Sequence, residues 1–139
     1  MEQKRSLMIV LFLGAFAFGL LFGRTPGFGQ MTPLDGKVFV GEIGKKGQKT
    51  GDKDDLIFKD GKFLSTACAK YGFTEAPYTA MAGEKKTSFE TETVSSSGGT
   101  MKWKGTVQGK MVRATIIWSK PDNPPQELWY RGKLGQQGD

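Results

Sequence analysis

Hydrophobic and polar residues alternate with a period of two from Lys37 onward, and short turns containing Gly or Pro interrupt the alternation. This period is typical of β-strands that have one face packed and one face in water. No segment in this region has a helical period long enough to predict a helix. The pattern predicts eight strands, at about 37–43, 55–59, 62–67, 77–82, 86–94, 100–107, 110–118 and 126–134.

The clearest turn lies between the second and third predicted strands. Asp60 and Gly61 form a dipeptide typical of two-residue type I′ turns, which places Phe58 opposite Phe63 across the hairpin. Both faces of this hairpin are partly apolar. We expect the face with the two phenylalanines to be interior, because aromatic side chains bury the largest area.

A second hairpin joins the sixth and seventh predicted strands. A turn at residues 108–109 would place Trp103 opposite Ala114 on an apolar face, and Lys104 opposite Arg113 on a polar face. A large side chain facing a small one suits a closely packed interior. The hairpin therefore predicts a sheet with one packed face and one solvated face.

A third turn, at residues 83–84, would place Tyr78 opposite Phe89 as an aromatic cross-strand pair. The hairpins and the flanking strands together predict an interior built from one face of every strand. The predicted interior residues are Val38, Val40, Phe58, Phe63, Tyr78, Phe89, Trp103, Val112, Ile116, Trp118, Leu128 and Tyr130.

Short connections indicate that consecutive strands are neighbours in an antiparallel, up-and-down order. Eight such strands remove their exposed edges by closing on themselves. The fold prediction is all-β: a single eight-stranded barrel over residues 30–134, followed by a disordered tail at 135–139. A barrel of this size is either filled by its own side chains or holds one small ligand.

The first residues have the layout of a secretory signal. Lys4 and Arg5 precede an unbroken apolar run over residues 7–23. We expect residues 1–29 to be a cleaved signal peptide or, alternatively, an uncleaved helix that anchors the chain in the inner membrane. In both cases the remainder is expected in the periplasm or outside the cell.

The amino-acid composition excludes several kinds of catalytic and metal-binding site. The chain has no histidine, a single cysteine and a net charge of +6. The missing imidazole excludes Ser-His-Asp and Cys-His catalysis, ordinary zinc sites and His-ligated haem, and the missing second cysteine excludes an internal disulfide. We expect no cofactor, no metal and no catalytic residue, and the export signal argues against a nucleic-acid partner.

The single cysteine, Cys68, follows the third predicted strand. Lys70 is close enough in sequence to lower the pKa of the thiol, but there is no histidine to make it a catalytic nucleophile. Three roles remain open. Cys68 is a buried small hydrophobe between Ala67 and Ala69, or forms an intermolecular disulfide, or is a ligand or redox contact.

Five surface residues are candidates for an anion or partner contact. Lys102, Lys104 and Arg113 lie on the polar face of the second hairpin, and Trp129 and Arg131 share the outward face of the last strand. The alternative is that these are ordinary solvated side chains.

Two charged stretches resemble known motifs but lack residues that those motifs require at fixed positions. GEIGKKGQKTG lacks the glycines that a phosphate-binding loop needs before Lys49 and Thr50. DKDD lacks the Gly and the final Glu of a calcium loop. We interpret the first stretch as a basic connecting loop and the second as a solvated turn.

An exported eight-stranded meander with Gly36 near the start of its first strand and Arg131 on its last resembles the lipocalin-type barrels, or calycins, over residues 34–134. Val38 stands where those families usually have Trp. The stretch FKDGKFLSTACAKYGF followed by PY also resembles small uncharacterised bacterial envelope proteins. The lipocalin-type resemblance implies binding of a small apolar ligand in the barrel mouth.

These observations favour an exported, non-catalytic binding or accessory protein of the cell envelope, which holds a small apolar ligand or presents its surface to an envelope protein. An alternative is a lyase-, isomerase- or hydrolase-type enzyme that uses the carboxylates Glu90, Glu92 or Asp55. Another is an assembly protein cross-linked into a dimer through Cys68. The interior candidates for ligand contacts are Phe58, Phe63, Tyr78, Phe89, Trp103, Ile116, Trp118 and Tyr130.

Overall fold

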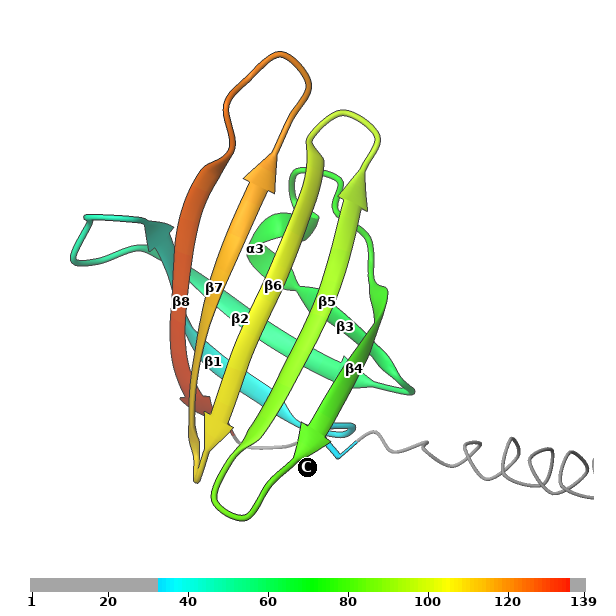
Figure 1. Ribbon diagram of the computed structural model, residues 1–139, viewed down its shortest axis with the longest axis vertical. Helices are drawn as coiled ribbons and strands as arrows, with labels where there is room; N and C mark the ends of the chain where they lie inside the picture. The colour runs from blue at the N-terminus through cyan, green and yellow to red at the C-terminus, as the bar shows by residue number, and fades with distance from the viewer. Residues whose placement is uncertain (1–32, 136–139) are drawn as a thin grey trace, which may run out of the picture. The chain divides into compact units, whose positions relative to one another are not determined.

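The computed structural model describes residues 33–135, which form a closed barrel of antiparallel strands in the order β1 to β8 (Figure 1). The predicted eight-stranded barrel is confirmed. The predictions for the signal or anchor segment and for residues 136–139 lie outside the described residues. The strands are β1 (Val38–Lys45), β2 (Asp52–Lys59), β3 (Lys62–Ser65), β4 (Ala76–Ala82), β5 (Thr87–Ser95), β6 (Gly99–Gln108), β7 (Met111–Ser119) and β8 (Gln126–Leu134).

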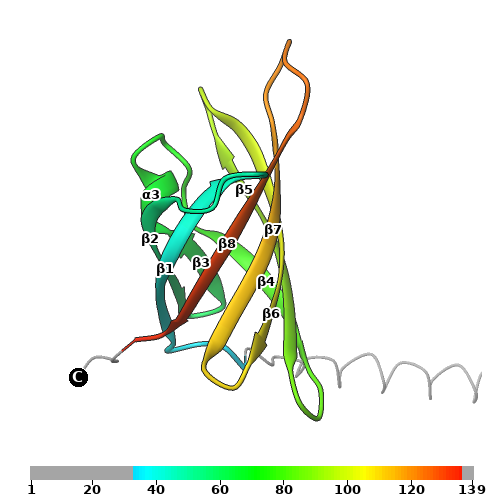
Figure 2. The same ribbon diagram turned by 90° about the vertical axis from the view of Figure 1, so that its left-hand side faces the viewer.

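The barrel closes where β1 pairs with β8, from Phe39 opposite Leu134 to Lys45 opposite Leu128. Figure 2 shows this wall, with β1, β8 and β7 side by side. A short helix, α3 (Thr66–Ala69), follows β3 where the sequence pattern predicted two more strand residues. Among the described residues, no helix has the length and apolarity to cross a membrane.

The β2–β3 hairpin has the predicted register, with Phe58 opposite Phe63. Asp60 and Gly61 have φ angles of 53° and 77°, as a type I′ turn requires. Both phenylalanines are fully buried, so the aromatic face is the interior face as predicted.

The register of the β6–β7 hairpin differs from the prediction by two residues. Trp103 faces Ile116, and Ala114 faces Gly105. The turn lies at Gly109 and the residue after it, because only Gly109 adopts the positive φ of 62° that the first turn position needs. Glycine is required at residue 105, because a Cβ there would clash with the Phe89 ring and approach the Ala114 Cβ.

The β4–β5 hairpin is also shifted by two residues. Tyr78 faces Thr91, and Phe89 faces Ala80, so the predicted Tyr78–Phe89 cross-strand pair is wrong. The connection is a four-residue loop over residues 83–86, closed by a 2.8 Å hydrogen bond from the Gly83 N–H to the Lys86 carbonyl.

The predicted face of β1 is wrong. Val40 is 40% exposed and Val38 is half-buried, whereas Phe39 between them is fully buried. Three consecutive apolar residues leave the alternation ambiguous, and the larger aromatic area is the part that packs inside.

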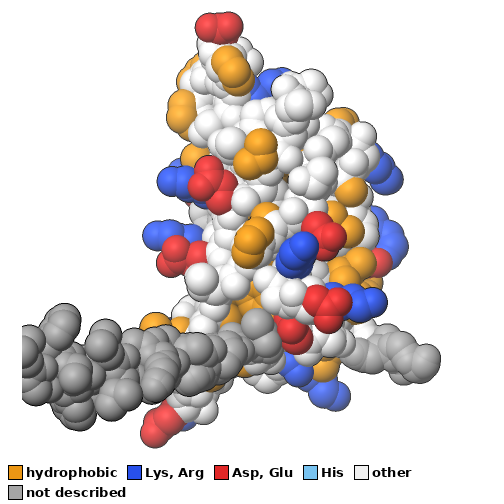
Figure 3. Space-filling view, turned by 90° about the vertical axis from the view of Figure 1, so that its right-hand side faces the viewer, with side chains coloured by type: hydrophobic (Ala, Val, Ile, Leu, Met, Phe, Trp, Pro, Cys, Tyr) orange, Lys and Arg blue, Asp and Glu red, His pale blue; other side chains and the backbone are white. Residues whose placement is uncertain are grey.

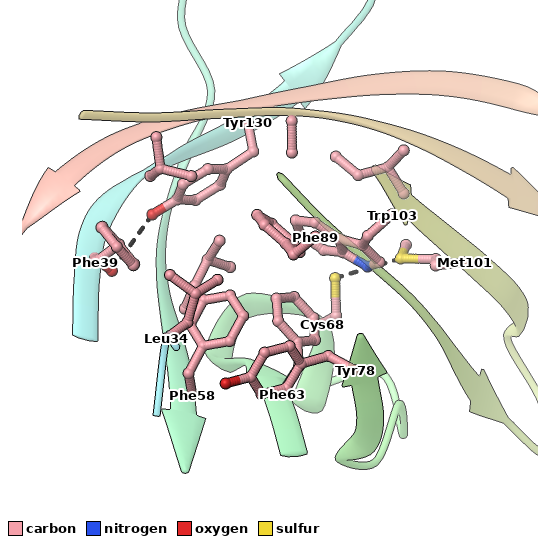
Figure 4. Close-up of a cluster of buried hydrophobic side chains, with 14 of the residues drawn as sticks. Leu34, Phe39, Phe58, Phe63, Cys68, Tyr78, Phe89, Met101, Trp103 and Tyr130 are labelled. Atoms are coloured by element: carbon pink, nitrogen blue, oxygen red, sulfur yellow. Dashed lines mark hydrogen bonds between the residues drawn. The ribbon is translucent and has the colours of Figure 1, made fainter. Parts of the chain in front are cut away.

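The interior is a solid aromatic cluster (Figure 4). The Phe58 ring lies at its centre, 4.8 Å from the Tyr78 ring and 5.1 Å from the Phe89 ring, centroid to centroid. Phe63 links this group to Trp103 at 4.8 Å. The predicted interior residues of β2 to β8 are therefore confirmed as core, with Trp118 partly buried against it.

The two ends of the barrel differ (Figure 1). At one end, which we call the mouth, lie α3 and the loops β1–β2, β5–β6 and β7–β8. The other end, which we call the closed end, carries the three tight hairpin turns and the segment before β1. Leu34 in that segment is only 2% exposed and plugs the closed end.

Candidate functional site

A cavity of about 460 Å³ opens at the mouth beside α3. Pockets for small molecules occupy about 300–1,000 Å³ and are mostly apolar. Apolar side chains form most of this cavity wall, and polar residues of the β1–β2 loop lie at its rim. The lining residues are Ile43, Gly44, Lys45, Gln48, Thr50, Gly51, Asp52, Ala67, Cys68, Tyr71, Phe73, Met101, Trp118 and Leu128.

Helix α3 forms one wall of the cavity, and Ser65 and Asp54 hold it in place. The Ser65 hydroxyl caps the helix by accepting a hydrogen bond from the Cys68 N–H at 3.2 Å. It also donates to the Asp54 carboxylate at 2.8 Å, and the Ala67 N–H donates to the same carboxylate at 3.0 Å. A single helical turn is unstable alone, so these contacts fix its position.

Asp54 is a buried carboxylate, which the charged residues around it in the sequence did not indicate. The DKDD stretch is not a solvated turn but the start of β2, and Asp54 has no exposed surface. Burial raises its pKa to about 6, against the opposing effect of the hydrogen bonds from Ala67 and Ser65. The alternation of the strand does indicate that Asp54 faces inward. Asp54 lies four residues before Phe58, and residues an even number of positions apart lie on the same face of a strand.

Cys68 points into the cavity wall and is 4% exposed. Its Sγ lies 3.5 Å from the Sδ of Met101 (Figure 4). Burial raises the pKa of the thiol to about 11, so the expectation that Lys70 lowers it is wrong. The group is protonated at neutral pH and is therefore a poor nucleophile.

A buried donor lies close to these sulfur atoms. The Trp103 indole is 1% exposed, and its Nε1–H has no hydrogen-bond partner among the described residues. Figure 4 shows the indole nitrogen on the side of the ring where Cys68 and Met101 lie. An unpaired buried donor costs stability, and this one lies in the core rather than among the residues that line the cavity.

The structure separates the interior candidates from the cavity. Of the eight residues proposed for ligand contact, only Trp118 lines the cavity, and its Nε1 donates to the Gly98 carbonyl at 2.7 Å. The others belong to the aromatic core beneath. The Tyr78 hydroxyl bonds to Asp35 at the closed end, far along the barrel from the mouth.

A second hollow, the outer groove, lies on the outside of β6, β7 and β8 and has a volume of about 750 Å³. The β1–β2 loop borders it, and Gln48 lines both hollows. Its lining residues are Gln48, Lys49, Lys104, Thr106, Arg113, Ala114, Thr115, Trp129, Tyr130 and Arg131.

The outer groove brings together four of the five predicted surface contacts, all except Lys102. Their predicted geometry is partly wrong, because Lys104 faces Thr115 rather than Arg113. Lys102 and Lys104 instead face Glu92 and Glu90 on β5. Figure 3 shows a face on which acidic and basic side chains are interspersed in this way.

The proposed catalytic carboxylates do not form a site. Glu90 and Glu92 are exposed on the outer face of β5, and Asp55 lies 3.3 Å from the Lys53 ammonium. Among residues 33–135, no group of three or more Cys, Asp or Glu side chains could hold a metal ion.

Comparisons of this chain with protein-family models, with curated proteins and with solved structures find no match.

Proposed function

We propose that this protein is an exported, non-catalytic binding protein that holds a small, mostly apolar molecule in the mouth cavity. The observation that carries the proposal is the cavity itself, which has an apolar wall and a ligand-sized volume above a solid core. The lipocalin-type resemblance supports the same use of a barrel mouth. Export follows from the signal-like sequence before the barrel.

The cavity chemistry favours binding over catalysis. Its one thiol, Cys68, is protonated at neutral pH because its pKa is about 11. A cross-link to a second chain through Cys68 would require α3 to move, since only 4% of the residue is exposed.

Titration with a neutral apolar fluorophore, N-phenyl-1-naphthylamine, tests the proposal. Trp118 lines the cavity, so saturable binding is expected to quench its emission and enhance that of the probe. An Ala67→Phe substitution fills the cavity from α3 and is expected to weaken binding at least about tenfold.

Ala69→Phe is the matched control, because Ala69 lies on the same helix but is exposed and outside the cavity lining. This variant is expected to bind the probe as the parent does. Absence of saturable binding, or equal binding by the parent and Ala67→Phe, would overturn the proposal.

A further inference from the structure

Positively charged side chains dominate the lining of the outer groove. Lys49, Lys104, Arg113 and Arg131 line it together with the hydroxyls of Thr106 and Thr115, and no carboxylate is among the lining residues. We propose that the outer groove binds a phosphate group, with Arg113 and Arg131 as its principal contacts. This site is separate from the apolar cavity and does not depend on a ligand there.

Arg131 is held in one position. Its Nε donates to Glu42 at 3.0 Å, its Nη2 donates to the Lys49 carbonyl at 2.7 Å, and its guanidinium lies 4.8 Å from the Trp129 ring centroid. A guanidinium has five N–H donors, so these contacts leave others for the groove. A cation fixed in this way loses little conformational freedom when it binds an anion.

The Trp129 ring, which lies against the Arg131 guanidinium, is also held in position by its neighbours. Its Nε1 donates to the Lys45 carbonyl at 2.9 Å, and its ring lies against the outer side of Gly44. A Cβ at Gly44 would be 2.5 Å from the ring, so only glycine permits this approach. The β1–β2 loop and β8 are thus joined at the edge of the groove.

Arg113 is a groove cation without an ion-pair partner among the described residues. It lies directly opposite Arg131 in the β7–β8 pair and opposite Thr106 in the β6–β7 pair. Within the described part of the chain, no hydrogen bond or ion pair engages its side chain. Like charges directly opposite each other destabilise a sheet, and a shared anion removes that repulsion.

The neighbouring strand pair shows how this sheet otherwise places its charges. Lys102 faces Glu92 and Lys104 faces Glu90, opposite charges that favour each other. Arg113 and Arg131 are instead two like charges that face each other within the outer groove. Exceptions of this kind to the local pattern of a fold are expected at functional sites. Arginine is also the residue whose fork of donors matches two phosphate oxygens.

The ligand phosphate is either free in solution or part of a lipid headgroup at a membrane surface. Both sources present the same tetrahedral oxyanion to the two arginines. Titration with pyrophosphate at constant ionic strength tests the first source, and sedimentation with phosphatidylglycerol vesicles, against phosphatidylcholine vesicles, tests the second. The Trp129 indole N–H resonance reports on the groove in the pyrophosphate titration, and the fraction of pelleted protein reports vesicle binding.

Arg113→Gln is the test variant, and Lys133→Gln is its matched control. Lys133 lies on the same outer wall, on β8, and its substitution changes the net charge equally, but it does not line the groove. We expect Arg113→Gln to weaken binding at least about tenfold and Lys133→Gln to change it less than about twofold.

Loss of pyrophosphate binding in Arg113→Gln alone supports a soluble phosphate ligand. Loss of phosphatidylglycerol binding in Arg113→Gln alone supports a lipid headgroup. Equal weakening by both substitutions would show a diffuse effect of charge and overturn the proposal. So would a failure of the parent protein to bind either probe.

Discussion

The two ends of the barrel use the same kind of contact for opposite purposes. At the closed end, the Asp35 carboxylate accepts hydrogen bonds from the Gly61 N–H at 3.0 Å and the Tyr78 hydroxyl at 2.8 Å. At the mouth, the Asp54 carboxylate accepts from the Ala67 N–H and the Ser65 hydroxyl. Asp35 therefore links the segment before β1 to the β2–β3 turn and to β4, and Asp54 links β2 to the start of α3.

The difference lies in what each carboxylate positions. Asp35 fixes the segment whose Leu34 side chain fills the closed end. Asp54 fixes a helix at the side of the opening and leaves the cavity beside it. The barrel is thus sealed by packing at one end and kept open by a buried polar network at the other. Substitutions at the two ends should separate stability from binding.

Leu34→Ala is expected to have the largest effect on stability. The side chain is 2% exposed, and truncating a buried leucine costs about 2–5 kcal/mol of unfolding free energy. Urea denaturation measures the loss. Binding of the apolar probe at the mouth should be unchanged under conditions in which the variant is folded.

Val40→Ala provides the comparison for Leu34→Ala. Val40 lies on the outer face of the nearby strand β1 and is 40% exposed, so its truncation should cost less than about 1 kcal/mol. If the two substitutions cost the same, Leu34 does not plug the closed end.

The mouth should become more stable as the pH falls from 7 to 5. The Asp54 pKa is about 6 in the folded chain against 3.8 without burial, so the folded state takes up the proton more readily. Stability is therefore lost as the pH rises through the folded pKa. The difference in pKa corresponds to at most about 3 kcal/mol, and a little under half of that gain, about 1 kcal/mol, should be complete by pH 5.

Urea denaturation at pH 7, 6 and 5 measures this gain, and Asp54→Asn should abolish it. The Glu42 pKa is lowered, by the Gly51 N–H and Arg131, so this group loses its stabilising charge only below its ordinary 4.5, outside the window. If the unfolding free energy of the parent protein is constant or falls between pH 7 and 5, burial does not raise the pKa of Asp54.

The contrast between the ends was only partly predictable from the sequence. Alternation and turn residues indicated eight strands and their closure, because a solvated face and a packed face leave a period of two. They did not locate two of the hairpin turns. A slip of two residues, as between Trp103 and its partner Ile116, leaves every side chain on the same face, so alternation cannot detect it.

The cavity and Asp54 were less predictable for a different reason. The cavity at the mouth is lined by residues of β1, β2, β6, β7, β8 and α3, whose side chains meet only after the barrel closes. Asp54 looked solvated because it stands in a charged run, and the donors that permit its burial come from Ser65 and Ala67 on another element. The surface cations Arg113 and Arg131 were found by parity, but their direct opposition depends on register.

At the closed end, Tyr78→Phe should have a moderate effect. The substitution removes the hydroxyl that donates to Asp35 at 2.8 Å, and a hydrogen bond to a charged group contributes about 1.5–3 kcal/mol. Asp35 keeps its bond from the Gly61 N–H, so we expect a loss near the lower end of that range. Thermal or urea denaturation measures it.

Tyr71→Phe tests whether loss of a tyrosine hydroxyl alone explains the effect. Tyr71 is 70% exposed, so this change should alter the unfolding free energy by less than about 0.5 kcal/mol. A Tyr78→Phe variant as stable as the parent would show that Asp35 holds the closed end through Gly61 only.

At the mouth, Cys68→Ala should have the smallest effect. Alanine preserves the helical turn, since the Ser65 cap bonds to the backbone N–H of residue 68 and not to its thiol. The substitution removes one sulfur atom, which lies 3.5 Å from the Met101 Sδ at the cavity wall. We expect a loss of about 1 kcal/mol or less in urea denaturation, with binding of the apolar probe retained.

Met101→Ala sets the scale for that contact, because it removes a longer side chain from the same place and should cost about 2–5 kcal/mol. If Cys68→Ala costs as much as Met101→Ala, the thiol is a structural member of the core. If it instead abolishes probe binding while stability is unchanged, Cys68 contacts the ligand directly. The expected result, little change in either measurement, leaves the cavity shape to α3 and Met101 and makes the thiol a small apolar part of the wall.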